Sequence, residues 1–173
     1  LIIQNESSRK TILHWTIVIG IFMSFLISRL NIINLQKTVY EPTTKIIAHR
    51  GFMEKGVENT LSSLIASAEA GADMVEIDIQ QTKDGKFIVF HDASLTRLAG
   101  KKESVYQMTQ AELMEVTVHS GQLSDTIPSL EQMLEKSREL NIQLLIEVKP
   151  HGYETADMLE RLIAVLDQYR ALD

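Results

Sequence analysis

The chain of 173 residues contains no cysteine. This absence excludes disulfide bridges, thiolate zinc sites and cysteine nucleophiles together. Any metal ion that the chain binds must therefore use carboxylate or imidazole ligands. Carboxylates favour hard cations that bind through oxygen. The absence of cysteine leaves the cellular compartment open.

Basic charge is scarce in the larger part of the chain. The first 40 residues carry a net charge of +3, from four basic residues and one acid, and the whole chain carries −6, so residues 41–173 carry −9. Domains that bind nucleic acid typically present a basic patch. An acidic domain repels the phosphate backbone, and we therefore expect no nucleic-acid partner.

Formal charge is absent from residues 11–28, a run of 18 residues. Including the next few residues, a mostly apolar segment covers 11–35, which is long enough for a membrane-spanning helix of ~20 residues. A signal peptide is the main alternative, but its apolar core is usually ~7–15 residues and a small-residue cleavage site should follow. A buried helix of a soluble core is the other alternative. We predict a transmembrane helix, because no such cleavage site follows residue 28 and the segment is apolar on all faces.

The chain flanking this segment divides into an amino-terminal flank, 1–10, and a polar linker, 36–44, which contains Pro42. Arg9 and Lys10 flank the amino side of the helix, and Arg29 and Lys37 flank its carboxyl side, so the positive-inside rule counts the two sides nearly equally. The pair directly beside the helix start decides the orientation that we predict. The prediction is an amino end inside and the following domain outside the cytoplasm.

Residues 45–173 alternate short apolar runs with amphipathic segments. We expect strands over 45–51, 74–80, 87–91 and 143–149, and helices after Asn59 or Thr60, after Ser129 up to about 140, and over 155–172. Such alternation indicates a parallel sheet. The turn 83–86 between the second and third strands is short, as in a hairpin. Residues 93–127 are polar and irregular, with a short helix after Thr109.

A (β/α)₈ barrel has eight strand–helix units in ~250 residues, with its active site at the carboxyl ends of the strands. The four strands therefore predict an α/β fold in which about the first half of such a barrel is present, behind the transmembrane helix. The chain begins at Leu1 rather than Met and ends after an amphipathic segment. We expect it to be part of a longer protein.

Glu76 and Asp78 lie on one face of the second predicted strand, because side chains alternate with a period of two. Val75, Ile77 and Ile79 then face the helices. Two neighbouring carboxylates in a barrel interior repel each other unless they are paired, and a divalent cation would resolve this repulsion. An exposed strand with a polar face explains this pair equally well.

Glu147 favours the metal site. It lies near the carboxyl end of the fourth predicted strand, in an apolar run that we expect to be buried. Three carboxylates, Glu76, Asp78 and Glu147, would make a suitable site for Mg²⁺ or Ca²⁺. Lys149 points the same way, and either holds a phosphate oxygen or forms a salt bridge to one of the acids.

His49 and His91 each end a predicted strand and precede a charged residue. A lone histidine in such a place is usually structural, but two near a metal site are better explained as a general acid–base pair. The guanidinium of Arg50 suits a phosphate. Gly51 permits a tight turn that would expose His49 and Arg50.

These residues belong to a set of short motifs that resembles the glycerophosphodiester phosphodiesterase family. The motifs follow the order of that family: His49-Arg50-Gly51, Glu58-Asn59-Thr60, Glu76-x-Asp78, Thr82-x-Asp84-Gly85, His91-Asp92, Pro128-Ser129-Leu130 and Ile146-Glu147-Val148-Lys149. They extend from residue 46 to about residue 150. Val57 and Leu98 depart from common family residues at positions outside the proposed chemistry.

The resemblance implies a (β/α)₈ barrel with an insertion at about 93–127, and residues 45–173 as the amino-terminal part of the domain. It implies metal ligands at Glu76, Asp78 and Glu147, catalytic histidines at 49 and 91, and phosphate contacts from Arg50 and Lys149. The implied cofactor is Ca²⁺ or Mg²⁺. Which histidine is the base stays open.

The reaction implied is hydrolysis of a small glycerophosphodiester to sn-glycerol 3-phosphate and an alcohol, as a step of lipid metabolism. Two alternatives remain. One is a related lipid phosphodiesterase of the phospholipase D or C type. The motifs Glu58-Asn59-Thr60 and Pro128-Ser129-Leu130 favour the glycerophosphodiester phosphodiesterase family over this alternative. The other is an inactive membrane-anchored binding module. Such a module would be expected to have lost a ligand or a histidine, and all are present.

Overall fold

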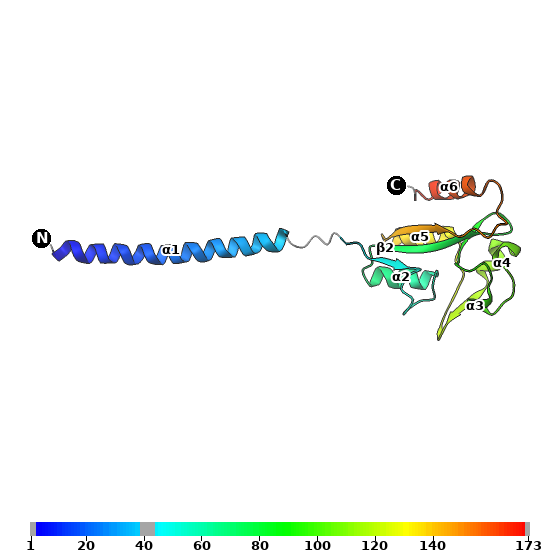
Figure 1. Cartoon of the computed structure of the whole chain (residues 1–173), viewed down its shortest axis with the longest axis horizontal. Coiled ribbons are helices and arrows are strands. Elements are labelled where there is room, and N and C mark those ends of the chain that lie inside the picture. The colour runs from blue at the N-terminus through cyan, green and yellow to red at the C-terminus, as the bar shows by residue number, and fades with distance from the viewer. Residues whose placement is uncertain (1–2, 39–43, 172–173) are drawn as a thin grey trace. The chain divides into compact units, whose positions relative to one another are not determined.

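The structure is a computed structural model that describes residues 3–38 and 44–171 (Figure 1). It divides into two compact units, Leu1–Thr44 and Lys45–Asp173.

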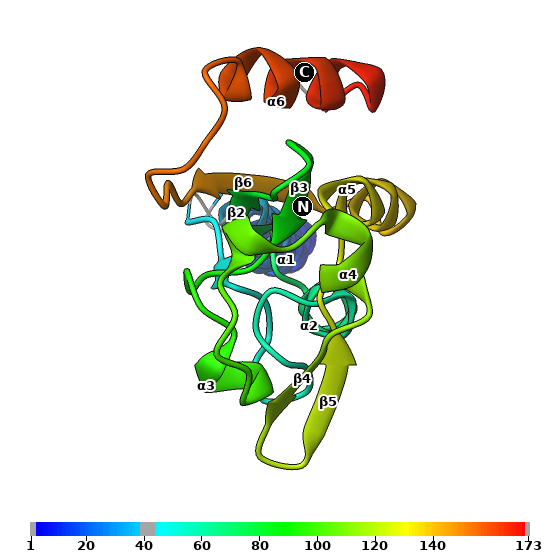
Figure 2. The same cartoon turned by 90° about the vertical axis from the view of Figure 1, so that its right-hand side faces the viewer.

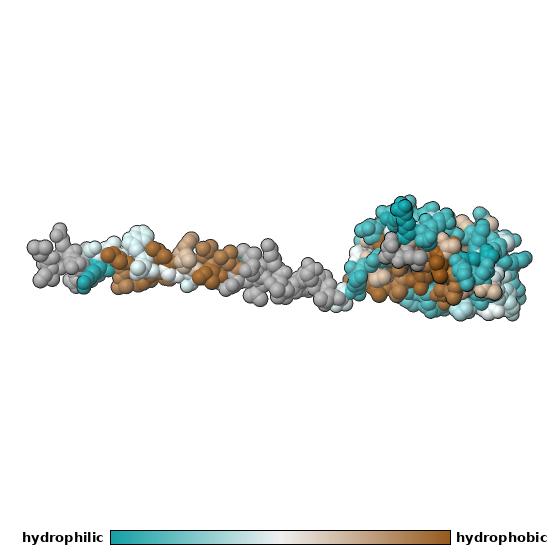
Figure 3. Space-filling model, turned by 90° about the horizontal axis from the view of Figure 1, so that it is seen from above, coloured by the Kyte–Doolittle hydropathy of each residue, from teal (hydrophilic) through white to brown (hydrophobic). Residues whose placement is uncertain are grey.

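The described residues of the first unit form one long helix, α1, Ile3–Thr38. Within it, Ser8–Leu30 forms a stretch of 23 residues with a mean hydropathy of 1.9, none of it buried. Figure 3 shows apolar side chains along this helix. Its length and composition suit a membrane span, and a signal sequence near the amino terminus has the same features. The helix covers the predicted span 11–35 and continues to Thr38, into the predicted linker, of which residues 39–43 lie outside the described part.

The second unit is built on a four-stranded sheet in which β2, Met74–Gln81, is central. Strand β2 pairs in parallel with β1, Ile47–His49, and with β6, Gln143–Val148. The register places His49 beside Glu76 and Asp78 beside Glu147. The three carboxyl ends therefore meet at one edge, as predicted.

Strand β3, Phe87–Val89, is antiparallel to β2. The turn between them contains Gly85 at φ +73°, a conformation that favours glycine. The predicted hairpin is thus confirmed. Within the described residues the parallel part of the sheet consists of three strands. Strand β3 runs back from the edge at which the carboxyl ends of these three strands meet.

Helices α2, Leu61–Glu69, and α5, Leu130–Glu139, begin where the capping signals predicted. Thr60 is the N-cap of α2, and the Ser129 hydroxyl accepts a hydrogen bond from the Gln132 amide at 3.2 Å. Gly71, at φ +80°, follows the end of α2. Capping residues of these types satisfy amides and carbonyls that a helix end leaves free.

Helix α6, Met158–Gln168, is shorter than the predicted 155–172. The helix begins at Met158 rather than at Thr155 because Thr155 is hydrogen-bonded to β2. Its amide donates to Gln81 Oε1 at 2.7 Å, and its hydroxyl accepts from Gln81 Nε2 at 2.9 Å. These bonds hold the loop after β6 on the end of β2.

The predicted irregular segment 93–127 contains more regular structure than expected. The predicted helix after Thr109 is present as α4, Gln110–Met114. The segment also contains α3, Thr96–Ala99, the short 3₁₀ helix η1, Val105–Gln107, and an antiparallel hairpin of β4, Thr117–Ser120, and β5, Leu123–Thr126. A separate apolar cluster that includes Phe90, Leu95 and Leu113 stabilises it.

The main core lies on one face of β2, where Val75, Ile77 and Ile79 are at most 1% exposed. They pack with side chains from α2, α5 and α6, among them Leu64, Leu130 and Leu162. Figure 2 shows α2, α5 and α6 spread around β2 and β6. The predicted helix-facing side of β2 is confirmed, and the opposite face carries the acids.

Two strands predicted to be buried are partly exposed. Ile47 in β1 is 46% exposed, and Leu145 in β6 is also 46% exposed. Among the described residues, each of these strands has a partner on its β2 side alone. The apolar sequences predicted burial because such runs are typical of inner barrel strands, but the edges away from β2 lack neighbours in the described part.

Candidate active site

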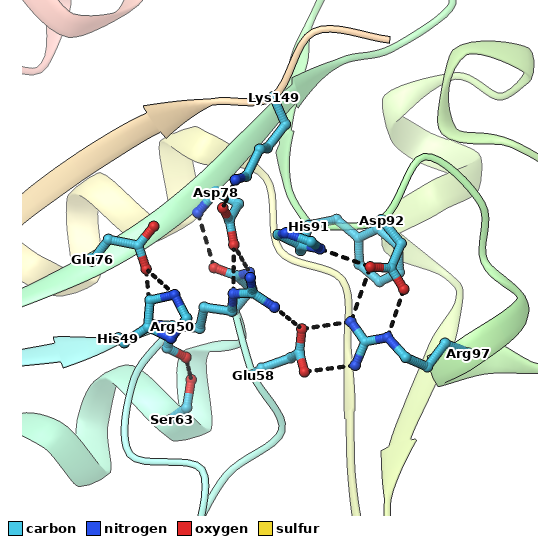
Figure 4. A network of polar contacts seen from close by, with 12 residues as sticks. His49, Arg50, Glu58, Ser63, Glu76, Asp78, His91, Asp92, Arg97 and Lys149 are labelled. Atoms are coloured by element: carbon cyan, nitrogen blue, oxygen red, sulfur yellow. Dashed lines mark hydrogen bonds and ion pairs between the residues drawn. The ribbon is translucent and has the colours of Figure 1, made fainter.

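The site is built on the polar face of β2. Glu76 is 7% exposed and Asp78 is fully buried. Glu147 on β6 lies beside Asp78 in the register, and one ligand atom from each of these three carboxylates lies within 4.8 Å of the others. The structure therefore brings together the three predicted acids (Figure 4 shows the surroundings of Asp78).

Two oxygens of this cluster have no hydrogen-bond partner among the described residues: Glu76 Oε1 and Asp78 Oδ1, both buried. A buried charged oxygen without a partner is costly, and a bound cation would supply the missing contact. The Glu147 side chain is 52% exposed and leaves the cluster open to solvent. Oxygen donors in this arrangement fit a hard divalent cation such as Mg²⁺ or Ca²⁺.

Among the described residues, Lys149 is the cationic side chain that lies nearest to the three carboxylates. Its Nζ lies 2.5 Å from Glu147 Oε1 and 3.4 Å from Asp78 Oδ1. The hydrogen bond to Glu147 raises the pKa of Lys149, and the same bond lowers the pKa of Glu147. The salt bridge that the sequence left as one alternative is thus present, and 27% of the Lys149 side chain remains exposed.

The turn after β1 presents His49 to solvent. The His49 side chain is 64% exposed, and its Nε2 lies 3.8 Å from Glu76 Oε2. Arg50 and Gly51 follow at φ +56° and +86°, and the Arg50 amide donates to Glu76 Oε2 at 3.0 Å. A Cβ on Gly51 would lie 2.4 Å from Ser63 Oγ, so this position requires glycine for space as well as for its backbone angle.

Arg50 is not exposed by this turn, contrary to the prediction. Its side chain is 19% exposed because the guanidinium lies between two carboxylates: Nε is 3.1 Å from Asp78 Oδ2, and Nη1 is 3.2 Å from Glu58 Oε1. Asn59, at φ +59°, completes the surroundings of Asp78 through its Nδ2 at 2.8 Å from Oδ2. The side chains of Glu58 and Asn59 therefore support the site.

His91 lies just after β3 and is held by its neighbour. Its Nδ1 is 2.7 Å from Asp92 Oδ1, and its side chain is 30% exposed. Arg97 contacts both Asp92 and Glu58. Hydrogen bonds from Arg97 are the largest cause that lowers the pKa of both carboxyls. A continuous chain of contacts thus leads from His91 through Asp92, Arg97 and Glu58 to Arg50 (Figure 4).

Sequence reasoning assigned no role to Asp92, Arg97 or Glu58. The signal was present in part, because Glu58 and Asp92 belong to the motifs Glu58-Asn59-Thr60 and His91-Asp92. Arg97 lies 39 residues from Glu58, and no local pattern connects the two. Their contact depends on how the insertion folds against the turn after β1.

Comparison with known proteins gives a consistent result. The profile of the glycerophosphoryl diester phosphodiesterase family matches residues 49–170. A glycerophosphodiester phosphodiesterase of Bacillus altitudinis is 33% identical over 135 residues, which cover 75% of this chain and 55% of the relative.

Solved structures agree with this match. A phosphodiesterase of Oleispira antarctica in complex with its product sn-glycerol 3-phosphate is similar with a TM-score of 0.66 and 31% identity, over 73% of this chain and 53% of that chain. A glycerophosphodiester phosphodiesterase of Thermotoga maritima is similar with a TM-score of 0.59 and 30% identity, over 72% and 50% of the two chains. The chain spans about half the length of the relatives that it matches.

Proposed function

The chain belongs to the glycerophosphoryl diester phosphodiesterase family, and from that premise we propose that the protein hydrolyses glycerophosphodiesters to sn-glycerol 3-phosphate and an alcohol. The observation that carries this proposal is the cluster of Glu76, Asp78 and Glu147, in which two buried oxygens accept no hydrogen bond from the described residues. The cluster lies at the carboxyl ends of parallel strands, where barrels of this kind place their chemistry.

Glu76, Asp78 and Glu147 would hold a divalent metal ion, Ca²⁺ or Mg²⁺. A metal bound there supplies Lewis-acid stabilisation of the charge that develops on the phosphate oxygens. Lys149 neutralises part of the acidic cluster through its contacts with Glu147 and Asp78. This reduces the repulsion that an anionic substrate meets on approach.

Arg50 and Lys149 are the proposed phosphate contacts. Lys149 is 27% exposed, and the four-carbon stem of a lysine has enough rotatable bonds to turn the ammonium toward a ligand. Arg50, in contrast, is held by Asp78 and Glu58. A guanidinium oriented in this way costs little further ordering when a phosphate binds, which is the advantage of a preorganised site. Arg50 would thus orient the phosphate and Lys149 would close on it.

His49 and His91 would transfer the protons. One imidazole takes a proton from the nucleophile, either water or the neighbouring glycerol hydroxyl, as the oxygen attacks phosphorus. The other gives a proton to the alcohol oxygen as its bond to phosphorus breaks. Both side chains are accessible, at 64% and 30% exposure.

Helix α1 would anchor the enzyme as a transmembrane span, because no small-residue cleavage site follows its apolar stretch. On this proposal residues 1–10 flank the span, 11–35 cross the bilayer, 36–44 link it to the domain, and 45–173 belong to a catalytic domain outside the cytoplasm. The insertion occupies about 93–127.

The test is release of glycerol 3-phosphate from glycerophosphocholine by the full-length protein, with EDTA and with added Ca²⁺ or Mg²⁺. We expect release that requires metal, and a loss of at least about a hundredfold in His49→Ala, since general acid–base catalysis contributes about 10²–10⁴-fold. His119→Ala, an exposed histidine of β4, is the matched control. Hydrolysis unaffected by EDTA, or normal turnover in His49→Ala, would contradict the proposal.

A further inference from the structure

Arg97, in the four-residue helix α3, forms four hydrogen bonds with two carboxylates. Its guanidinium forms two hydrogen bonds with Asp92, from Nε to Oδ2 at 2.7 Å and from Nη2 to Oδ1 at 3.1 Å. It forms two more with Glu58, from Nη1 to Oε2 and from Nη2 to Oε1, each at 2.7 Å. Both carboxylates are thus bound by the guanidinium in a bidentate manner, the geometry that arginine favours.

Asp92 in turn holds His91. The carboxyl of Asp92 has a lowered pKa, first because of Arg97, so it is ionised at neutral pH and can only accept a hydrogen bond. The proton of the contact at 2.7 Å therefore lies on His91 Nδ1. The other ring nitrogen, Nε2, is left for chemistry, and Figure 4 shows that edge of the ring directed toward Asp78 and Lys149.

We propose that Arg97 is a positioning residue: it holds Asp92 against His91, with Glu58 as its anchor, and so keeps His91 in the orientation and tautomer that the reaction needs. The inference rests on the proposed hydrolysis, because His91 is one of its two proton-transfer groups. Arg97 itself contacts neither the carboxylate cluster nor Lys149 in the contacts that the structure describes.

A purely stabilising surface ion pair explains this arrangement less well. The carboxylates are largely shielded, with side-chain exposures of 11% for Glu58 and 24% for Asp92, and they lie on either side of one guanidinium. Without Arg97 the two negative charges would face each other, and Asp92 would be free to turn away from the ring. A lysine cannot replace the guanidinium of Arg97, because its single ammonium does not bind two carboxylates in a bidentate manner.

The experiment uses the full-length, metal-loaded protein and compares Arg97→Met with the matched control Arg161→Met. Arg161 is also an exposed arginine with one carboxylate partner, Asp157, but it lies on α6. We expect kcat to fall about tenfold to a hundredfold in Arg97→Met, a part of the ~10²–10⁴-fold that acid–base catalysis supplies. KM and metal affinity should stay within about threefold, and Arg161→Met should match the wild type.

The double variant separates positioning from general damage. In the His91→Ala background, Arg97→Met should reduce kcat by less than about twofold, since residues that act through one group are not additive. A full tenfold loss in both backgrounds, or wild-type kcat in Arg97→Met, would overturn the proposal. If Arg97→Met does not fold, Asp92→Asn takes its place, with the same pattern expected.

A spectroscopic measurement keeps the inference separate from the proposed reaction. Nitrogen NMR of labelled histidine should find the proton of neutral His91 on Nδ1 in the wild type and a mixture of tautomers in Arg97→Met. This measurement needs no turnover. If the wild type hydrolyses no glycerophosphodiester with any divalent metal, the proposed function fails, while an unchanged tautomer in Arg97→Met refutes the role of Arg97.

Discussion

Glu76 and Asp78 are each held in the structure by a neighbour that donates a hydrogen bond to one carboxylate oxygen and leaves the other oxygen without one. Glu76 Oε2 accepts the Arg50 amide, while Glu76 Oε1 is buried without a partner. Asp78 Oδ2 is bound by Asn59, and Asp78 Oδ1 faces Lys149 at 3.4 Å. One oxygen of each carboxylate thus accepts a hydrogen bond within the fold, and on the proposed function the other oxygen would contact the metal ion.

Replacement of Glu76 by Gln tests this division. The amide oxygen can still accept from Arg50, but one buried charge is lost. We expect Glu76→Gln to be at least as stable as the wild type in EDTA, and to lose about 1.4 kcal/mol of metal-dependent stabilisation for each tenfold loss in metal affinity. Thermal unfolding with and without Ca²⁺ or Mg²⁺ measures both effects.

The exposed Glu69 on α2 provides the control, since Glu69→Gln should leave both unfolding curves unchanged. Equal metal-dependent stabilisation in Glu76→Gln and the wild type would exclude Glu76 as a ligand.

The pH dependence of stability should reveal the Arg97 contacts. Arg97 lowers the pKa of Glu58 below 4.5 and that of Asp92 below 3.8, their ordinary values. A carboxyl with a lowered folded-state pKa stabilises the fold above its ordinary value, and this contribution is lost as the pH falls through the folded pKa. Arg97→Met should therefore be less stable than the wild type at about pH 7, and the difference should shrink below about pH 4.

Urea unfolding at a series of pH values measures this difference. A difference in unfolding free energy between the wild type and Arg97→Met that stays constant as the pH falls below about 4 would show that the ion pairs do not cause the difference.

Gly51 and Gly71 form a matched pair for backbone strain. Their φ angles are +86° and +80°, but a Cβ on Gly51 would lie 2.4 Å from Ser63 Oγ, whereas a Cβ on Gly71 meets nothing within 4 Å. Alanine at either position should cost about 1–2 kcal/mol for the backbone angle. Gly51→Ala should lose a further ~1–3 kcal/mol through overpacking, and equal losses in urea unfolding would refute the close approach of Ser63.

At the scale of elements, local patterns predicted most of the sheet and the helix starts. The alternation in β2 separated Val75, Ile77 and Ile79 from the acids, and the turn with Gly85 predicted the β2–β3 hairpin. The β4–β5 hairpin escaped prediction because its strands are short, polar and mostly exposed, so no apolar alternation marks them. The contact of Arg97 with Glu58 was not predicted, because two residues that lie far apart in the sequence share no local hydrophobic or charge pattern.

Helix α5 offers a test of such a local signal. Its N-cap Ser129 accepts a hydrogen bond from the Gln132 amide, and the Ser129 amide donates to Gln132 Oε1 at 3.1 Å. Ser129→Ala should destabilise the domain by about 1 kcal/mol, the usual cost of a lost cap. Ser124→Ala, an exposed serine of β5, should change the urea midpoint little; equal effects would mean that the cap does not contribute.

At the scale of the whole molecule, the described domain is the first half of a (β/α)₈ barrel. Its three parallel strands supply the acids and His49, and the excursion through β3 supplies His91. The insertion then returns to the site through Arg97 and ties these two regions together. The partly exposed edges of β1 and β6 are where neighbouring strands would complete the sheet, since a barrel has no free edge.

Helix α1 gives the last prediction. Its described large apolar side chains are exposed, for example Ile19 at 58% and Phe22 at 65%, and on the proposed anchoring a bilayer would cover them. We expect the full-length protein to stay in the membrane fraction after a high-salt wash. A variant without residues 1–44 should be released and still hydrolyse substrate, because residues 45–173 belong to a separate compact unit.

A point variant separates a span from a signal sequence. Arginine at the centre of a spanning helix costs about 2.5–3.5 kcal/mol, so Ile19→Arg should weaken membrane retention while Ile19→Leu retains it. Amino-terminal sequencing of the membrane-bound protein should find α1 intact. A mature protein that begins after Leu30 would instead identify α1 as a signal sequence, and the site would then work without an anchor.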